Sequence, residues 1–235
     1  MTGSQKTVMW DFDGTLAYRP LTWSGTMMEI LSRECPGHDV KIEQIRLYMS
    51  KVYPWCMPEN PHPRLSAPSA WWAYMESAIA GAYESAGISS AAARSLARLF
   101  HRHYTDPGGF ILYDDTKKTL EHFCSAGWRN VILSIHVPEL TRIVEDLGIG
   151  GYFFACLSSA DTGFEKPNPE AFRLALSLCG NPEVVWMVGD NIEADAKGAQ
   201  SLGIPAVLVH AQNKNGSEFH AETLGGVIRI IEENS

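Results

Sequence analysis

Short apolar runs alternate with amphipathic stretches through the second half of the sequence, and this alternation limits the possible folds more than any other feature. Beyond Pro107, strands are predicted at 130–134, 152–157, 184–188 and 206–209, and helices at 115–125, 138–146, 169–178 and 192–201. One more apolar run, from Thr7 to Trp10, predicts a strand near the N-terminus. Alternation of this kind is typical of a parallel sheet with helices on both faces. We therefore expect an α/β fold with a doubly wound parallel sheet.

The segment between the first strand and the alternating part has a different character. It is rich in Trp, Met and Ala, and helices are predicted at 24–34, 40–52, 68–86 and 89–104. A helical block inserted after one strand is expected to fold as a separate cap. We therefore predict two domains, a core made of residues 1–17 and 107–235 and a helical cap domain made of residues 18–106. Residues 213–216 are predicted to form a surface loop.

Composition and charge narrow the functional classes. The net charge of −8 argues against a general nucleic-acid binder, which usually carries a basic stripe. It permits a small anionic substrate, because a bound cation can reverse the field in one cleft. The five scattered cysteines have no zinc-ligand spacing, and no apolar run approaches the ~20 residues of a membrane span. We expect a cytoplasmic protein without a membrane or nucleic-acid partner, and the sequence leaves its oligomeric state, monomer or dimer, open.

Two aspartates stand at the end of the first predicted strand. In the run Asp11-Phe12-Asp13-Gly14-Thr15 both carboxylates follow the apolar residues, and the glycine breaks the strand. Ligands and catalytic groups of open α/β sheets gather at the carboxyl ends of the strands. A carboxylate pair there can bind a divalent cation and divide the roles of nucleophile and proton carrier. The same residues suit an ordinary turn, but their place directly after a strand favours a functional site.

Two further polar residues occupy comparable positions. Ser134 ends a predicted strand, where its hydroxyl could hydrogen-bond a phosphate oxygen, although strands often end in serine. Lys166 is followed by Pro167 and Pro169 at the entrance of a predicted helix. Lysines usually extend into solvent, but one held between rigid residues at this edge could neutralise a phosphoryl group and a nucleophilic carboxylate.

A second acidic pair follows the predicted strand 184–188. Asp190 lies at the end of that strand, and Asp195 lies one turn into the next predicted helix. These acids could complete a magnesium site with Asp11 and Asp13, because Mg²⁺ prefers oxygen ligands. The alternative is a helix-capping acid followed by a solvated one.

Taken together, these residues resemble the motifs of the haloacid dehalogenase superfamily of phosphohydrolases. The motifs are Asp11-Phe12-Asp13-Gly14-Thr15, then Ser134, then Lys166-Pro167, then Gly189-Asp190 with Asp195. The resemblance covers residues 1–17 and 107–235 and implies a Rossmann-like core, and the insertion resembles that family's helical (C1-type) cap. The sequence departs from the pattern at Ile135, where an asparagine commonly follows the serine, and this puts substrate contacts in doubt more than chemistry.

The resemblance implies a division of labour between the first two acids. Asp11 would attack phosphorus and form an aspartyl-phosphate, and Asp13 would protonate the leaving alcohol and then deprotonate the attacking water. Mg²⁺ would be held by the Asp11 side chain, the backbone carbonyl of Asp13 and Asp190.

The remaining motif residues are implied to act around that centre. Lys166 and Ser134 would take the rest of the phosphoryl charge. Asp195 would support Lys166 or a metal-bound water, and Gly14 and Thr15 would support the first motif.

Asp13 also separates the reactions known in the family. Members that cleave carbon–halogen bonds lack a carboxylate at this position and need no metal, and members that cleave phosphonates lack it too. The resemblance therefore implies a Mg²⁺-dependent phosphatase that acts on a small phosphorylated metabolite. Two alternatives remain at this stage: a phosphotransferase or mutase with a sugar acceptor, and a non-catalytic binding protein of the same fold.

Side chains of the predicted cap could form a roof over the substrate. The candidates are Trp23, Trp55, Trp71, Trp72, Arg19 and Arg64. Aromatic residues at helical spacing more often form the core of a helical domain, and that interpretation is favoured here. The histidines at positions 62, 101, 103 and 136 have no metal-ligand spacing and are predicted to be structural or solvated.

Overall fold

A computed structural model describes residues 5–212 and 217–235, so the loop predicted at 213–216 lies outside the described residues. One lobe is built on a six-stranded sheet in which every adjacent pair of strands is parallel. In spatial order the strands are β5 (Phe153–Ser158), β4 (Trp128–Ser134), β1 (Lys6–Trp10), β6 (Val184–Gly189), β7 (Ala206–Val209) and β8 (Phe219–Ala221). The predicted α/β fold class is confirmed.

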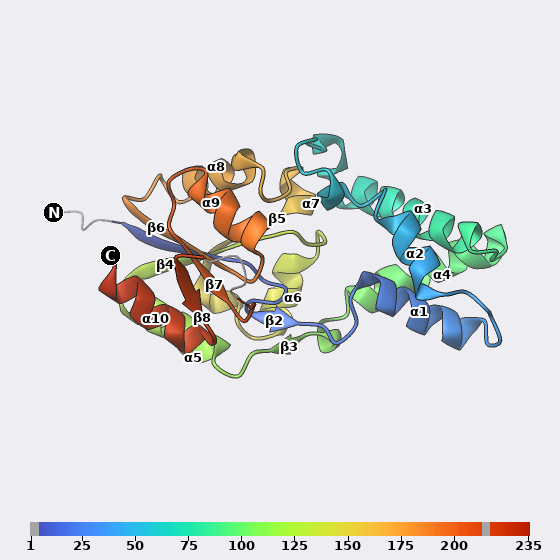
Figure 1. Cartoon of the computed structure of the whole chain (residues 1–235), viewed down its shortest axis with the longest axis horizontal. Helices are drawn as coiled ribbons and strands as arrows, with labels where there is room; N and C mark the ends of the chain where they lie inside the picture. The colour runs from blue at the N-terminus through green and yellow to red at the C-terminus, as the bar shows by residue number, and fades with distance from the viewer. Residues whose placement is uncertain (1–4, 213–216) are drawn as a thin grey trace.

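Helices cover both faces of the sheet (Figure 1). One face carries α8 (Pro169–Leu178) and α9 (Gly198–Gln200), and the other carries α5 (Thr116–Ser125), α6 (Leu140–Asp146) and α10 (Leu224–Glu233). The side chains of β1 alternate between these two layers. Val8 and Trp10 belong to the core under α5 and α10, whereas Met9 belongs to the core under α8. Burial on both faces explains why the strands read as continuous apolar runs.

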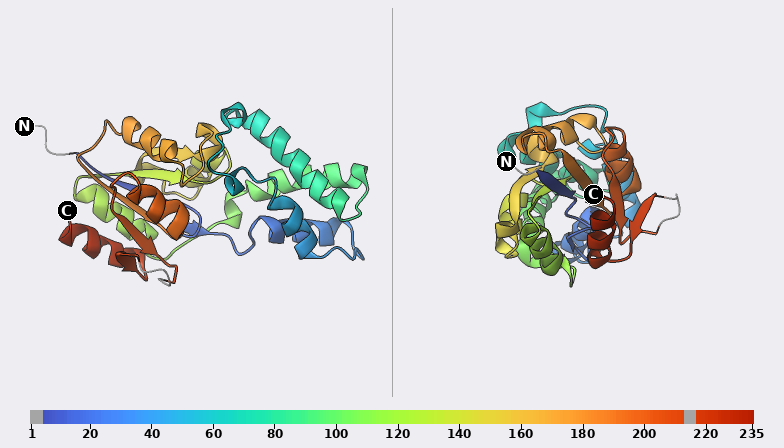
Figure 2. Two further views of the ribbon diagram at one scale, coloured as in Figure 1. Left: turned by 45° about the horizontal axis from the view of Figure 1, so that its top comes forward. Right: turned by 90° about the vertical axis from the view of Figure 1, so that its left-hand side faces the viewer.

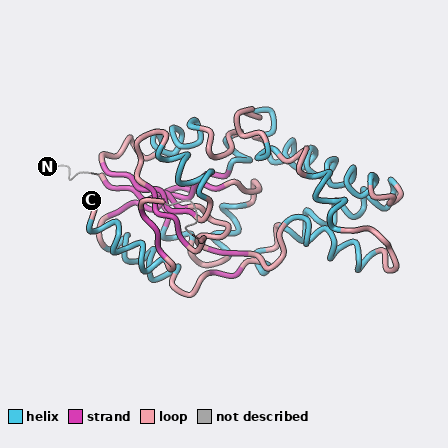
Figure 3. The backbone as a smooth tube through the Cα atoms, in the orientation of Figure 1, coloured by secondary structure: helices cyan, strands magenta, loops and turns pink. Residues whose placement is uncertain are grey.

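A second lobe is helical and lies beyond the carboxyl ends of the strands (Figure 3). It contains α1 (Trp23–Glu34), α2 (Ile42–Met49), α3 (Pro68–Ser85) and α4 (Ser90–Tyr104), with short 3₁₀ turns at Pro54–Cys56 and Pro63–Leu65. Figure 2 shows the same two-lobed shape from a second direction. This helical region is inserted between β1 and β4, as the sequence predicts, although α2 is shorter than expected.

Two parts of the chain connect the lobes. The first is a narrow antiparallel ribbon in which β2 (Ala17–Tyr18) pairs with β3 (Ile111–Leu112) where the chain leaves and re-enters the sheet lobe. The second is the segment around the two 3₁₀ turns, which contacts the loop before α8. There the backbone N–H of His62 donates to the Gly163 carbonyl at 2.8 Å, and its ring nitrogen lies 2.9 Å from the buried Glu165 carboxylate. The ribbon and this segment are therefore two of the places where the lobes meet.

Several elements were not predicted, and others differ at their ends. The unpredicted elements are β2, β3, β8, the short helix α7 (Ser159–Thr162) and α10. Two-residue strands such as β2 and β3 carry no periodicity that a sequence pattern could reveal. The helix predicted at 192–201 divides into a π-helical stretch, Ile192–Lys197, followed by α9. Within the described residues, no helix is long and apolar enough to cross a membrane.

Candidate active site

The sheet brings the predicted site residues to one edge. Trp10 at the end of β1 pairs with Ile132 of β4 and Val188 of β6, so the residues that follow these three strands emerge together. Asp11 and Asp13 follow β1, Ser134 ends β4 and Asp190 follows β6. Lys166 arrives from the loop before α8, and Asp195 from the π-helical stretch after β6. The structure thus places all six residues, which come from four separate stretches of the sequence, at the carboxyl edge of the sheet.

Asp11 is held by hydrogen bonds on one carboxylate oxygen. Its Oδ1 accepts from the Ser134 hydroxyl at 2.9 Å and from Lys166 Nζ at 2.8 Å. The Thr15 hydroxyl lies 3.5 Å from the other oxygen, Oδ2, and the Asp11 backbone N–H donates to the Val188 carbonyl at 2.9 Å. These contacts fix the orientation of a side chain that is only 10% exposed.

Lys166 bridges two acids in the interior. Its Nζ contacts Asp195 Oδ1 at 2.5 Å as well as Asp11, and its side chain is 2% exposed. Burial would lower the pKa of Lys166, but the charges of Asp11 and then Asp195 outweigh burial and raise the pKa above its ordinary value. The group is therefore a permanent cation. A buried lysine with two carboxylate partners is a fixed positive charge at the sheet edge rather than a solvated surface lysine.

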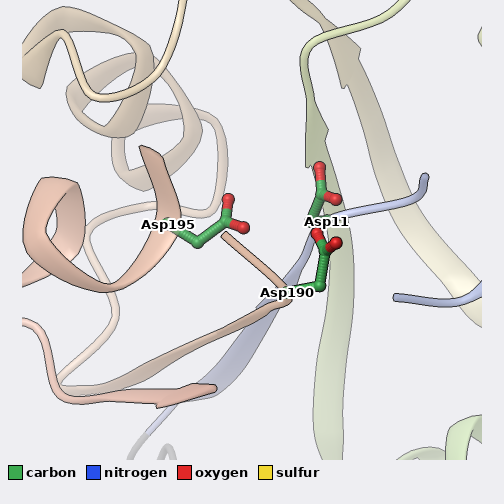
Figure 4. A group of neighbouring side chains, drawn as sticks. All are labelled: Asp11, Asp190 and Asp195. Carbon is green, nitrogen blue, oxygen red and sulfur yellow. The ribbon is translucent and has the colours of Figure 1, made fainter. Parts of the chain in front are cut away.

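The acids Asp11, Asp190 and Asp195 form a crowded cluster (Figure 4), with one oxygen of each lying within 4.8 Å of the others. Burial, and after it the charge of Asp11, raises the pKa of Asp190. Asp195 is committed to its neighbours, because Lys166 contacts its Oδ1 and the Asn191 backbone N–H donates to its Oδ2 at 3.0 Å.

The donor set of this cluster fits a divalent cation. Carboxylate oxygens are the ligands that Mg²⁺ prefers, and a cation would relieve the repulsion that raises the Asp190 pKa. The absence of a side chain on Gly14 leaves room for the Asp190 carboxylate. A Cβ atom on Gly14 would lie 2.3 Å from Asp190 Oδ2, and Gly14 also has a φ of +84°, which L side chains rarely adopt. Glycine at this position is therefore required both for the turn and for the approach of Asp190.

Asp13 faces a cavity rather than the buried cluster. Its side chain is 37% exposed, and its Oδ2 lies 3.5 Å from Nε2 of His136. Burial, and after it the charge of Asp11, raises the pKa of Asp13 to about 8, while Arg19 counters the shift. Water that enters the cavity moderates this effect. A raised pKa suits a group that must give up and take back a proton near neutral pH.

His136 is a site residue that the sequence analysis did not identify. It lies two residues after Ser134, its side chain is 1% exposed, and neither ring nitrogen has a good hydrogen-bond partner among the described residues. Burial lowers its pKa from 6.5 to about 4, so the ring is neutral. A lone histidine without metal-ligand spacing gives no pattern that marks it as part of a site. The sequence offers only its position, two residues after Ser134.

A cavity of about 360 Å³ opens between the acids and the helical lobe. Only some of the side chains that were predicted to form a roof over the substrate line this cavity. Trp23, Trp55 and Arg19 line it together with Asp13 and Asp190.

Three other candidates have different surroundings. Trp71 and Trp72 are buried, 1% and 5% exposed, in the hydrophobic core that includes the helical lobe. The Trp72 indole N–H donates to the Glu139 carboxylate of the sheet lobe at 2.9 Å. Arg64 is exposed in the short 3₁₀ turn. The prediction that cap aromatics are mostly core therefore fits two of the four tryptophans.

The fold and the site define a class of α/β protein with a parallel sheet, a carboxylate–lysine pair and an acidic cluster at its carboxyl edge, and an inserted helical lobe facing that edge. The model of the haloacid dehalogenase-like hydrolase family matches residues 5–203. The chain therefore belongs to the haloacid dehalogenase-like hydrolases, as the motifs indicate.

Single proteins that resemble this chain match it over only part of its length or at low sequence identity. A phosphoserine phosphatase from Thermus thermophilus is 35% identical over 150 residues, which cover 63% of this chain and 59% of that protein. In general the chain spans about half the length of the curated relatives it matches.

Two solved structures share the fold over nearly the whole chain. A 2-haloacid dehalogenase from Pseudomonas syringae has a TM-score of 0.69 and 21% identity, and covers 98% of this chain and 100% of its own. A hydrolase of the family from Bacillus subtilis, solved bound to magnesium, has a TM-score of 0.68 and 18% identity over 97% of this chain and 99% of its own. At these identities the likeness shows the fold alone.

Proposed function

We propose that this protein is a Mg²⁺-dependent phosphomonoester hydrolase that acts on a small phosphorylated metabolite through an aspartyl-phosphate on Asp11. The observation that carries the proposal is the arrangement around Asp11. One oxygen is held by Lys166 and Ser134, while Asp190 and Asp195 each place a carboxylate oxygen within 4.8 Å of an Asp11 oxygen, close enough to share one cation. The likeness to a phosphoserine phosphatase supports this chemistry.

The proposed metal ligands are the Asp11 side chain, the Asp13 backbone carbonyl and Asp190. The oxygen donors, their crowding and the magnesium bound in the Bacillus subtilis structure support this assignment. When bound, Mg²⁺ offsets the repulsion between a dianionic phosphate and the Asp11 carboxylate. Asp195 is proposed to position Lys166, since both of its oxygens already accept hydrogen bonds from the protein.

The chemistry then follows from this chain's own residues. Asp11 attacks phosphorus, the bond from phosphorus to the ester oxygen breaks, and Asp13 gives its proton to the departing alcohol. Asp13, now a carboxylate, removes a proton from water, which attacks the aspartyl-phosphate, releases phosphate and restores Asp11. Lys166 and Ser134 stabilise the phosphoryl oxygens throughout. Gly14 and Thr15 support the turn that places Asp11 and Asp13 on the same side.

The proposed domain division gives the helical lobe a role. Residues 18–106 would act as a cap over the core formed by 1–17 and 107–235, and the cavity between them would hold the alcohol part of the ester. A cap that closes over the substrate excludes water and sets specificity.

Hydrolysis of p-nitrophenyl phosphate tests the proposal. Activity should vanish with EDTA and return with Mg²⁺, and the Asp11→Asn variant should be inactive under both conditions. Full activity in EDTA would refute the metal assignment. Transfer of the phosphoryl group to an added sugar in place of phosphate release would favour a phosphotransferase, and no turnover of any ester would favour a binding protein.

A further inference from the structure

We propose that the cavity between the acids and the helical lobe holds a flat aromatic ring, so that the substrate is a phosphate monoester of an alcohol bearing an aromatic or heteroaromatic ring. This inference rests on the proposed phosphatase function and names its substrate class. The cavity, of about 360 Å³, lies at the lower end of the usual range for small-molecule sites. It suits a metabolite with one or two rings and not a large partner.

Part of the cavity wall is aromatic. Trp23 and Trp55 line it from the helical lobe, together with Tyr18 and Tyr104. The ring centroids of Trp23 and Trp55 lie 5.3 Å apart, and those of Trp23 and Tyr104 lie 4.5 Å apart. Aromatic rings offer large contact areas and favour stacked or edge-to-face contact with other rings.

The residues behind this wall hold it in place. Tyr53 stacks on Trp55 with centroids 4.1 Å apart, and Phe100 stacks on Trp23 at 5.0 Å. A ring that is already packed on its far side loses little conformational freedom when a ligand stacks against it. The aromatic wall is therefore pre-organised to receive a flat group.

Arg19 is a cation at the cavity that contacts of the helical lobe hold in place. Its terminal nitrogens donate to the backbone carbonyls of Tyr104 and His103 at 2.6 and 3.2 Å. The guanidinium also lies 4.8 Å from the Tyr104 ring centroid. These two bonds engage one N–H on each terminal nitrogen and hold the guanidinium against the helical lobe.

The charge of Arg19 also bears on cationic and sugar substrates. Its positive charge at the cavity opposes a quaternary ammonium, which aromatic walls would otherwise attract. A sugar would need several hydrogen-bonding side chains to replace its hydration. Apart from Arg19, the two tyrosine hydroxyls and the indole N–H groups of the two tryptophans, the helical side of the cavity supplies only the Thr22 side chain for this purpose within the described residues.

A pair of esters with equal leaving-group chemistry tests the proposal. Benzyl phosphate and cyclohexylmethyl phosphate both release a primary alcohol and have the same carbon count, but only the first has a flat π-face. We expect kcat/KM with Mg²⁺ to be at least about 10-fold higher for benzyl phosphate, in line with aromatic stacking in other sites. The comparison set also contains glucose 6-phosphate, choline phosphate and phosphoglycolate, which should all be slower.

The variant Trp55→Leu should remove most of this preference, because kcat/KM should fall about 10-fold more for benzyl phosphate than for cyclohexylmethyl phosphate. Phe154→Leu, which changes an exposed aromatic residue on β5, is the matched control and should leave both values unchanged. Equal rates for the two esters, an unchanged ratio in Trp55→Leu, or a sugar or choline ester as the best substrate would overturn the proposal.

Binding of benzylphosphonate, which cannot be hydrolysed, separates this inference from the proposed function. Titration calorimetry with Mg²⁺ should show wild-type binding about 10-fold tighter than for cyclohexylmethylphosphonate, and Trp55→Leu should lose the difference. If no ester is hydrolysed but this difference is present, the phosphatase proposal fails and the aromatic site stands. If esters are hydrolysed without any such difference, the aromatic site fails and the phosphatase proposal stands.

Discussion

At the scale of single residues, the site depends on charges held out of water. Lys166 and Asp11 form an ion pair with side chains only 2% and 10% exposed, and Asp195 shares the same lysine. Removing one partner of such a buried pair leaves an uncompensated charge. Asp13 has a different environment, because it faces the cavity and its pKa is raised to about 8. Two carboxylates two residues apart are thus prepared for different roles.

Exchange of each carboxylate for its amide should separate those roles. Asp11→Asn should abolish turnover, since an amide cannot form the acyl-phosphate. Asp13→Asn should lower kcat by ~10²–10⁴-fold, because it removes acid–base catalysis but leaves the nucleophile in place. Steady-state kinetics with a phosphate-release assay measures both effects. Near wild-type rates in Asp11→Asn would show that another group is the nucleophile.

The buried His136 should make the folded protein sensitive to acid. Its pKa is lowered from 6.5 to about 4, so between these values the unfolded chain binds a proton that the folded protein does not. The free energy of unfolding contributed by this residue is therefore lost as pH falls from about 6.5 towards 4, by up to ~1.4 kcal/mol per pH unit.

Urea unfolding of wild type and His136→Asn at several pH values tests this expectation. The slope of unfolding free energy against pH should be shallower in the variant between about pH 4 and 6.5. Parallel curves for the two proteins would show that the ring is protonated in the folded state.

At the scale of elements, contacts between the two lobes show which aromatic side chains belong to the core and which line the cavity, a question that the sequence leaves open. The Trp72 ring of α3 stacks on His101 of α4 with centroids 3.6 Å apart. Its indole N–H reaches across to Glu139, just before α6. This tryptophan belongs to the packing between lobes and not to the cavity wall.

Trp72→Ala should therefore destabilise the protein without changing its specificity. We expect a loss of ~3–5 kcal/mol in the free energy of unfolding, because a large buried side chain is replaced by a cavity. The order of preference across the ester panel should match that of wild type. A variant of normal stability with an altered preference would place Trp72 against the substrate instead.

The elements also show which parts of the fold the sequence can reveal. Helices α1, α3 and α4 were predicted within about one residue, because capping positions and apolar spacing are local signals. The contact of His62 with Glu165 joins residues 103 positions apart. No local pattern indicates such a contact, and the ribbon of β2 and β3 was missed for the same reason.

The candidate site was predictable for a different reason. Asp11, Ser134 and Asp190 stand at strand ends, and parallel neighbours bring their strand ends together. His136 could not be found in this way, because its place at the site comes from its burial beside Asp13 and not from a strand end. The position of Trp55 on the cavity likewise depends on how the helical lobe meets the sheet lobe.

At the scale of the whole molecule, the two lobes contribute different kinds of side chain around the cavity. The sheet lobe supplies the acids, the lysine and the serine at one edge, and the helical lobe supplies the aromatic wall across the cavity. The net charge of −8 opposes an anionic substrate at long range, so a cation at the sheet edge must provide the local attraction. On the proposed function, chemistry and substrate choice would reside in different parts of the chain.

Trapping of the covalent intermediate tests the central claim most directly. Borohydride reduces an acyl-phosphate but not a free carboxylate, so rapid quenching during turnover should convert Asp11 to homoserine, which peptide mass spectrometry can locate. The account predicts this modification at position 11 in the presence of both a phosphate ester and Mg²⁺, and its loss when EDTA is added. Rapid phosphate release without any modification at position 11, or with modification at Asp13 instead, would contradict it.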